Sequence, residues 1–235
     1  MRPLAILIAG EPVPAALAAR GTFGVMIREA VGEAWSGPWA DVDARAELPN
    51  WDAFSGMIIS GSAANVPDRE EWVLTVERYL AEAVAAQLPL FGICFGHQLL
   101  AQALGGRVTR NPRGREIGTV TLEVFGEDPL FAQSARKLAA NMTHVDSVVR
   151  LPPGARVLAR TALDENAAVY FGARAWGVQF HPEMDADILR HYLAARGGAM
   201  RGEGLDPRSA SDEARDTPES RALLQRFVAR ELLGR

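Results

Sequence analysis

The sequence of 235 residues contains one cysteine, no excess of positive charge and no long apolar run. A single cysteine excludes an internal disulfide framework and a cysteine-rich zinc site. The net charge of -4, with arginines scattered among acidic residues, provides no basic surface for nucleic acid. The apolar run at residues 4–9 is too short for a signal peptide, and no stretch of about 20 apolar residues follows it. We therefore expect a cytoplasmic protein without a nucleic-acid or membrane partner.

Short apolar runs alternate with longer segments of helical period, which is typical of an α/β protein with a mostly parallel sheet. Residues 4–9, 54–60 and 88–94 are expected to be fully buried strands. Residues 70–87 place apolar side chains three and four positions apart and predict a helix that crosses between two of these strands. A second helix is expected directly after Cys94, ending at Gly105 and Gly106.

The C-terminal half changes to alternating apolar and polar residues. Strands are expected at 118–125, 155–161, 167–172 and 175–180, with a hairpin turn at 172–174. We expect residues 1–195 to form one domain, on which residues 196–235 pack as a polar loop followed by a C-terminal helix. The segment 196–220 is rich in Gly, Ser, Asp and Pro, and its composition predicts a mobile loop.

Cys94 lies in the sequence "GICFG", between an expected buried strand and an expected helix. Gly92 and Gly96 give the spacing of a nucleophile elbow, a tight turn that needs small neighbours and exposes the central side chain. A helix N-terminus favours a thiolate over a thiol, and its first backbone N–H groups are free to bind an oxyanion. A lone cysteine on an apolar strand is also commonly a packing residue. Both interpretations stay open until a base is found.

His181 is the histidine best placed to serve as that base. It follows the last expected strand in the sequence "GVQFHPE", and strand ends are where α/β sheets expose catalytic groups. Glu183 is spaced to accept a hydrogen bond from one ring nitrogen, which leaves the other for the sulfur. The same residues would also suit a turn into a helix at 185–195, since Pro182 fits a first helical position. His97 and His191 are expected to be ordinary helix residues.

The sequence resembles the class I glutamine amidotransferases. "GICFGHQLLAQALGG" is similar to the nucleophile motif of that family, and "GVQFHPE" is similar to its His/Glu motif. "NMTHVDSV" at 141–148 resembles a segment of the amidotransferase portion of GMP synthetase and its stand-alone relatives. The resemblance spans residues 4–193. It implies a three-layer α/β/α, flavodoxin-like fold with a mixed, mostly parallel central sheet.

The resemblance also implies a site. Cys94 would be the nucleophile, His181 the base and then the acid, and Glu183 the residue that orients His181. Backbone N–H groups around Gly61 and of Phe95 would form the oxyanion hole. Substrate would be held by the residues that match the glutamine-binding positions of the family: Gln98, His144, Val145 and Asp146. No metal or cofactor is expected.

Two departures from the family pattern stand out. "SGSAAN" replaces the common Gly-Gly-Pro type of loop, which leaves the oxyanion donor at Gly61 less defined, and Val145 stands where the GMP synthetase segment has glycine. No synthetase-like sequence follows Glu183. We therefore expect an amidotransferase module that works with a separate synthetase subunit as the ammonia acceptor.

Three functions are compatible with these motifs. The first is hydrolysis of the side-chain amide of L-glutamine to glutamate and ammonia, through a cysteinyl γ-glutamyl thioester. The second is a γ-glutamyl hydrolase or peptidase, because the same chemistry cleaves any γ-glutamyl bond that fits. The third is a binding module without chemistry. The intact set of Cys94, His181 and Glu183 disfavours the third.

Overall fold

A nine-stranded mixed sheet forms the centre of the computed structural model, which describes residues 1–125 and 128–234. The strand order is β2-β1-β3-β4-β11-β10-β9-β6-β7. The strands are β1 (Leu4–Ile8), β2 (Trp39–Asp43), β3 (Gly56–Ile59), β4 (Leu90–Ile93), β6 (Glu116–Val124), β7 (Lys137–His144), β9 (Arg156–Arg160), β10 (Ala168–Gly172) and β11 (Ala175–Val178). Parallel pairing joins β2, β1, β3, β4 and β11, and antiparallel pairing joins β11, β10, β9, β6 and β7.

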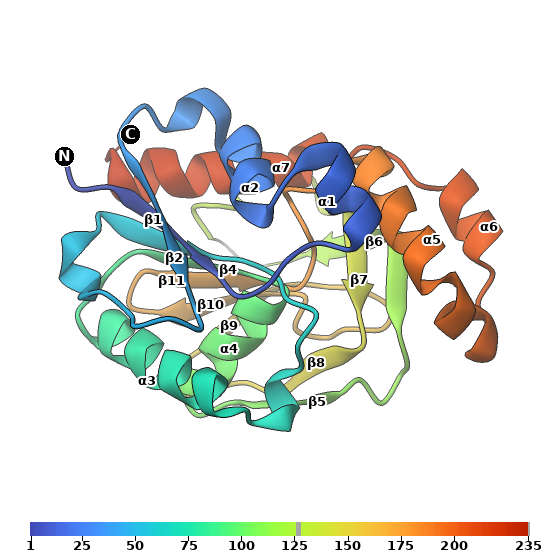
Figure 1. Ribbon diagram of the computed structural model, residues 1–235, viewed down its shortest axis with the longest axis horizontal. Helices are drawn as coiled ribbons and strands as arrows, with labels where there is room; N and C mark the ends of the chain where they lie inside the picture. Colours follow the sequence, from blue (N-terminus) through green and yellow to red (C-terminus); the bar gives the residue numbers. More distant parts are fainter. Residues whose placement is uncertain (126–127, 235) are drawn as a thin grey trace.

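Helices cover both faces of this sheet. In Figure 1, α1 (Pro14–Arg20), α2 (Phe23–Val31) and α7 (Pro218–Phe227) lie above the sheet, and α3 (Glu71–Ala85) and α4 (Phe95–Ala103) lie below it. Helices α5 (Ala186–Gly202) and α6 (Pro207–Asp212) lie beside β6 and β7. Short 3-10 turns span Gly32–Ala34, Trp51–Ala53 and Val66–Asp68, and a π-helical turn spans Val228–Leu232. The three-layer α/β fold is thus confirmed.

Each face of the sheet has its own core, because the parallel strands are apolar on both sides. On one face, Phe91 and Phe227 pack with ring centroids 5.3 Å apart, which fixes α7 against β4. On the other face, Leu80 of α3 and Leu99 of α4 are fully buried against β3 and β4. Strand β4 is therefore held between two layers, and the turn that follows it has little freedom to move.

A small second sheet pairs β5 (Arg107–Arg110) with β8 (Asp146–Arg150). The chain leaves the main sheet at His144, the last residue of β7, and enters the second sheet at Asp146. Val145 is the single residue between them. Residues 144–146 therefore form a corner that is fixed by two sheets at once.

The expected strands at 4–9, 54–60 and 88–94 and the helix at 70–87 are all present, within a few residues of their expected bounds. The hairpin turn is also present, with positive φ at Gly172, Ala173 and Arg174. The sequence interpretation did not anticipate β2, β5, β7 or β8. β2 contains charged residues and β5 is only four residues long, so neither shows the apolar run of a buried strand.

The expectation of a mobile loop at 196–220 is wrong. Helix α5 continues through Gly202, and α6 follows after a short turn. A separate apolar cluster holds this segment in place: Met200 and Ala214 are buried with Leu189 and Leu193. Composition suggested a loop because Gly197, Gly198 and Gly202 lower helix propensity, but burial of the intervening apolar residues outweighs that cost.

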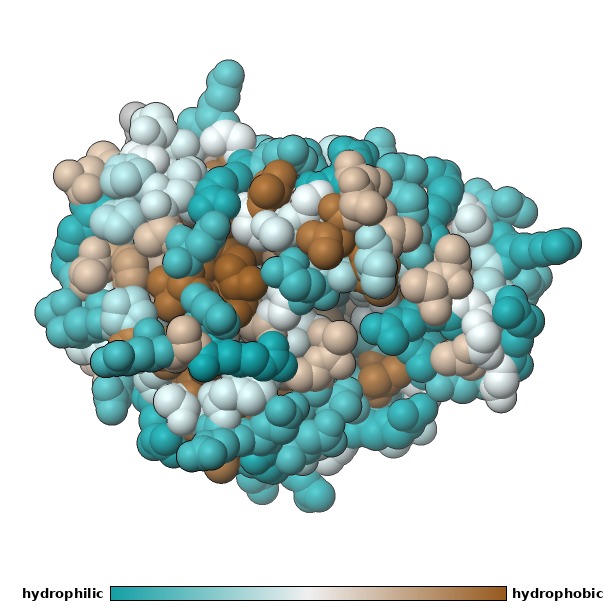
Figure 2. All heavy atoms as spheres, viewed as in Figure 1, coloured by the Kyte–Doolittle hydropathy of each residue, from teal (hydrophilic) through white to brown (hydrophobic). Residues whose placement is uncertain are grey.

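The surface is mostly hydrophilic on the face shown in Figure 2, with apolar residues in small separate groups. Within the described residues, no helix is both long and apolar enough to cross a membrane.

Candidate active site

Cys94 occupies the turn between β4 and α4. Its backbone has φ +50° and ψ -99°, a conformation that is uncommon for a residue with a side chain. The side chain is 7% exposed, and the Cys94 N–H donates to Val178 O at 2.8 Å. Strained backbone at such a turn persists only where the surrounding structure enforces it. Here β4, α4 and β11 together hold the sulfur at the end of the sheet.

The glycines around Cys94 are required for packing. A Cβ on Gly92 would lie 2.6 Å from the carbonyl carbon of Gly96, and a Cβ on Gly96 would lie 2.6 Å from Ile59 O. Real Cβ atoms do not approach backbone this closely. The spacing in "GICFG" therefore allows α4 to start directly on top of β3 and β4.

Three neighbouring parallel strands bring the candidate residues together. Ile59 of β3 is paired with Gly92 of β4, and Val178 of β11 is paired with Ile93 of β4. Gly61, Cys94 and His181 follow these strands and so emerge at the same edge of the sheet. The carboxyl ends of parallel strands are where α/β proteins place their ligand sites.

His181 and Glu183 form a buried pair. Glu183 Oε1 lies 2.7 Å from His181 Nδ1, and the two residues are 0% and 2% exposed, respectively. His181 N–H donates to Asn141 O at 2.9 Å, which ties this loop to β7. Since Glu183 occupies Nδ1, the nitrogen that remains for the sulfur of Cys94 is Nε2.

The charge state of His181 reflects these neighbours. Burial alone lowers the pKa of an imidazolium. The carboxylate of Glu183 and the sulfur of Cys94 more than offset burial and raise the pKa of His181 to about 10. The ring is also flanked by aromatic side chains: the Phe23 centroid lies 6.5 Å away and the Tyr192 centroid 6.4 Å away. The environment of His181 thus favours its protonated form, and two aromatic rings lie close to it.

Gln179 is a residue that the sequence interpretation did not single out. Its Nε2 donates to Cys94 Sγ at 3.4 Å, and its Oε1 accepts from Gln98 Nε2 at 3.0 Å. Gln98 Nε2 also donates to Asp146 O at 2.8 Å. Gln179 lies within the quoted stretch "GVQFHPE", but only the pairing of β11 with β4 indicates that its side chain reaches the sulfur.

The residues expected to hold substrate line one cavity of about 170 Å³ beside Cys94: Gln98, His144, Val145 and Asp146 all contribute to its wall. Phe95, an expected oxyanion donor, lines the same cavity. Both hydrogens of the Gln98 amide are donated to protein acceptors, so only its Oε1 is left to accept a hydrogen bond. Arg110, Arg115 and Arg196 also line this cavity, and Arg110 and Arg115 both form ion pairs with the carboxylate of Glu203.

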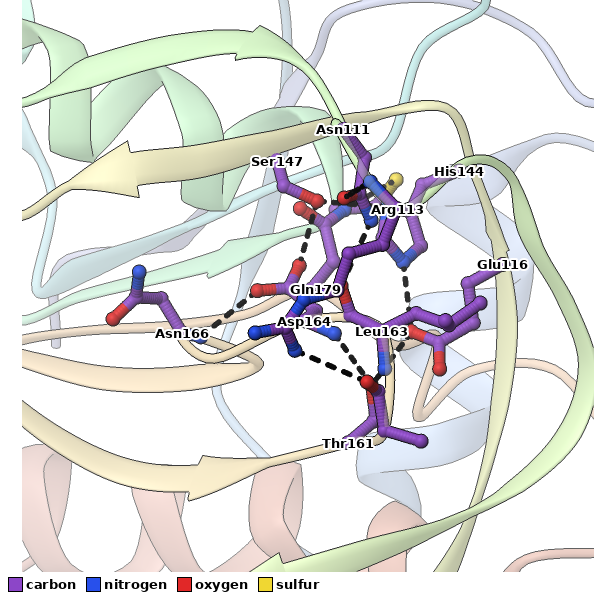
Figure 3. Close-up of polar contacts among 12 residues, drawn as sticks. Asn111, Arg113, Glu116, His144, Ser147, Thr161, Leu163, Asp164, Asn166 and Gln179 are labelled. Carbon is purple, nitrogen blue, oxygen red and sulfur yellow. Dashed lines mark hydrogen bonds and ion pairs between the residues drawn. The ribbon is translucent and has the colours of Figure 1, made fainter.

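Behind this cavity lies a buried polar network that the sequence did not reveal (Figure 3). His144 Nδ1 lies 2.9 Å from Asp146 O, and His144 Nε2 lies 3.2 Å from Glu116 Oε2. Thr161 Oγ1 donates to the same Glu116 oxygen at 2.9 Å. A carbonyl and a carboxylate both accept hydrogen bonds, so an imidazolium, in which both ring nitrogens donate, satisfies both contacts of His144.

The pKa of His144 agrees with this geometry. Burial lowers it, but hydrogen bonding to Glu116 and the nearby charges of Asp164 and Cys94 outweigh burial and raise it above its ordinary value. Ser147 Oγ, which donates to Asp164 at 2.9 Å, links the network to β8. These hydrogen bonds therefore hold the corner at residues 144–146 in place.

The two residues expected to supply oxyanion donors, Phe95 and Gly61, lie in different segments near Cys94. Phe95 is the first residue of α4 and lines the cavity. Gly61 is buried next to the imidazole: a Cβ there would lie 3.0 Å from His181 Cε1. Ser62 and Ala63, which follow Gly61, line the cavity wall beside Cys94. Within residues 1–125 and 128–234, no group of three or more His, Cys, Asp or Glu side chains could hold a metal ion.

A cysteine at a strand-to-helix turn, faced by a buried His–Glu pair from the adjacent parallel strand, defines a class of α/β proteins with a cysteine-centred site. The family model for glutamine amidotransferase class-I matches residues 38–196, and the chain belongs to this family.

Curated relatives share part of the chain. A subunit of the glutamine-hydrolyzing GMP synthase of Pyrococcus abyssi is 37% identical over 144 residues, covering 59% of this chain and 73% of that protein. A putative glutamine amidotransferase of Saccharomyces cerevisiae is 35% identical over 147 residues, covering 60% and 58%. A GMP synthase of Thermomicrobium roseum is 39% identical over 150 residues, but the match covers only 26% of that longer protein. The chain therefore spans about a quarter of the length of the last relative and somewhat more than half of the yeast one.

Solved structures match the whole fold. A glutamine amidotransferase from Thermotoga maritima superposes with a TM-score of 0.76 at 22% identity and covers 99% of both chains. A glutamine amidotransferase from Methylobacillus flagellatus has a TM-score of 0.73 at 23% identity, covering 100% of this chain and 95% of that one. At these identities the likeness concerns the fold alone.

Proposed function

We propose that the protein hydrolyses the side-chain amide of L-glutamine to glutamate and ammonia, with Cys94 as the nucleophile. The observation that carries this proposal is the placement of Cys94 in a strained turn beside the His181–Glu183 pair, where Oε1 and Nδ1 lie 2.7 Å apart. Membership in the class I family supports glutamine as the substrate.

The chemistry proceeds in two steps. The Cys94 thiolate attacks the amide carbon, the N–H groups of Phe95 and of the loop at Gly61 stabilise the oxyanion, and His181 gives its proton to the departing nitrogen. Water then loses a proton to His181 and attacks the thioester, which releases glutamate and restores the thiolate. Glu183 holds the imidazole in the orientation that both steps need.

The glutamyl group would occupy the cavity of about 170 Å³ beside Cys94. There Gln98 Oε1 and the backbone of His144, Val145 and Asp146 would receive its α-amino and α-carboxylate groups, with Arg196 in the same wall supplying positive charge for the carboxylate. The polar network around His144 keeps this wall in place (Figure 3).

A separate synthetase subunit is the proposed ammonia acceptor. The support comes from the matched Pyrococcus abyssi relative, whose name describes a subunit of GMP synthase. Ammonia released into neutral water is protonated and loses its nucleophilicity, so productive transfer would need a docked acceptor.

Glutamate release from L-glutamine by the purified chain tests the proposal. We expect turnover by the wild-type protein and its loss in Cys94→Ala, with the melting temperature of the variant nearly unchanged because one small side chain contributes little packing. Full activity of the folded Cys94→Ala variant would disprove the assignment of the nucleophile.

A further inference from the structure

Cys94 opens onto two cavities, and only one of them is explained by a glutamyl group. The second cavity has a volume of about 350 Å³, larger than the first. It shares Cys94, Ser62, Ala63, Thr143 and Arg196 with the first. Among the described residues, those that line only the second of these two cavities are Phe23, His181, Tyr192, Ala195 and residues 11–14.

The position of His181 decides which part of a substrate enters each cavity. Under the proposed function, His181 protonates the departing nitrogen, so the leaving group must lie on the His181 side of the sulfur. His181 lines the larger cavity and is not among the described residues that line the smaller one. The larger cavity is therefore on the leaving-group side.

Ammonia does not need a cavity of this size or kind. A water molecule, which is close to ammonia in size, takes up only about 30 Å³ in the liquid. Two aromatic side chains lie near the imidazole in this cavity: Phe23 is 2% exposed and Tyr192 is 6% exposed, with ring centroids 6.5 Å and 6.4 Å from that of His181. The charged residues Glu11 and Arg196 line other parts of the same cavity. Pro12 and Val13 extend the apolar part of the wall. An apolar or aromatic group would bury its surface here, whereas ammonia would gain nothing.

We infer that the same site also cleaves N-substituted γ-glutamyl amides whose amine carries an apolar or aromatic group. This inference rests on the proposed function and adds a second substrate class to it. The thiolate forms a bond to the γ-carbonyl carbon as the carbon–nitrogen bond breaks, and His181 transfers its proton to the nitrogen. The amine leaves from the larger cavity, and water hydrolyses the thioester as it does for glutamine.

The test compares substrates that differ only in the leaving group. L-glutamine, its N-methyl γ-amide and its N-benzyl γ-amide share one glutamyl group, and release of glutamate is measured for each with the intact chain. We expect kcat/KM for the benzyl amide to equal or exceed that for glutamine. Cleavage of glutamine with no cleavage of the benzyl amide would overturn the inference and leave the proposed function intact. Failure on all three substrates would instead reject the proposed function.

A variant that fills the larger cavity tests whether the benzyl group binds there. Ala195 on α5 is exposed and lines only the larger of the two cavities. We expect Ala195→Trp to lower the ratio of kcat/KM for the benzyl amide to that for glutamine by about tenfold or more, the size of effect that lost pocket contacts produce.

The matched control is Ala194→Trp. Ala194 precedes Ala195 on the same helix, is exposed and is not among the described residues that line either cavity. We expect it to leave that ratio unchanged. A ratio unaffected by Ala195→Trp, or lowered equally by both variants, would show that the benzyl group does not occupy this cavity.

Discussion

Gln179 donates a hydrogen bond from Nε2 to the sulfur of Cys94 over 3.4 Å, while its Oε1 accepts from Gln98. Gln98 in turn donates to the carbonyl of Asp146 in the corner that lines the smaller cavity. All four residues are less than 9% exposed, so water does not compete for these bonds. A chain of amide hydrogen bonds thus links the wall of the cavity to the reacting sulfur.

Gln179→Glu tests the role of this link. A glutamate keeps the acceptor for Gln98 but replaces the donor at the sulfur with a negative charge, which repels an anionic sulfur. We expect kcat/KM to fall about tenfold or more, because a hydrogen bond to a charged group contributes about 1.5–3 kcal/mol. Alkylation of Cys94 by iodoacetamide at neutral pH should slow in parallel. Unchanged alkylation together with unchanged kcat/KM would show that Gln179 does not act on the sulfur.

Glu183→Gln tests the orientation of His181. Glu183 is the largest of the influences that raise the pKa of His181, so its loss should move that pKa from about 10 toward or below the ordinary 6.5. The ring nitrogen chemical shifts of His181, followed by NMR against pH, measure this change.

The same variant has a kinetic consequence. We expect Glu183→Gln to lower kcat by about 10²- to 10⁴-fold and His181→Ala to lower it further, because orientation contributes less than the proton transfer itself. The reverse order of losses would show that the two roles are wrongly assigned.

Gly61→Ala tests the close approach of the loop to the imidazole. The added Cβ would lie 3.0 Å from His181 Cε1 and 3.5 Å from Phe23 Cζ, so the ring must shift. We expect kcat/KM to fall about 10- to 100-fold, since misplacement of a reacting group by a fraction of an ångström to an ångström has effects of this order. Chemical denaturation should show a change in unfolding free energy of about 1 kcal/mol or less. Activity equal to wild type would mean that the imidazole position is not critical.

The His144 network predicts a dependence of stability on pH. The folded-state pKa of His144 is raised, so its contribution to stability is fully present below the unfolded value of about 6.5 and is lost as pH rises through the folded value. We expect the stability of the wild type relative to His144→Asn/Glu116→Gln to be greater at about pH 6 than at about pH 9. Removing both partners avoids leaving a buried carboxylate unpaired. A difference that stays constant with pH would exclude a charged His144.

Gly198→Ala tests the helix that composition did not suggest. Gly198 lies within α5, and a Cβ there would meet nothing within 4 Å. We expect the unfolding free energy to increase by about 0.5–1 kcal/mol, because alanine loses less backbone freedom than glycine on entering a helix. Gly204→Ala is the matched control. A Cβ on Gly204 would also meet nothing within 4 Å, but Gly204 has φ +78°, which disfavours alanine, so this variant should lower the unfolding free energy of the protein. If residues 196–202 formed a loop, Gly198→Ala would not increase the unfolding free energy.

The sequence by itself determined the parts of this protein that depend on neighbouring residues. "GICFG" specifies a strand, a strained turn and a helix, because only glycine at 92 and 96 lets the backbone segments approach so closely. "HPE" specifies a histidine with its carboxylate two residues away. The buried strands β1, β3 and β4 and the crossing helix α3 also follow from local apolar patterns.

Only the tertiary structure decided which distant residues meet. The pairing of β11 with β4 places Gln179 at the sulfur, and the antiparallel pairing of β6 with β7 brings Glu116 to His144. The larger cavity is formed where Phe23 and Tyr192 come close to His181. Helix α5 extends through a glycine-rich segment because Met200 finds a buried position against Leu193. Each of these depends on contacts between residues far apart in the chain, which local propensity and spacing do not encode.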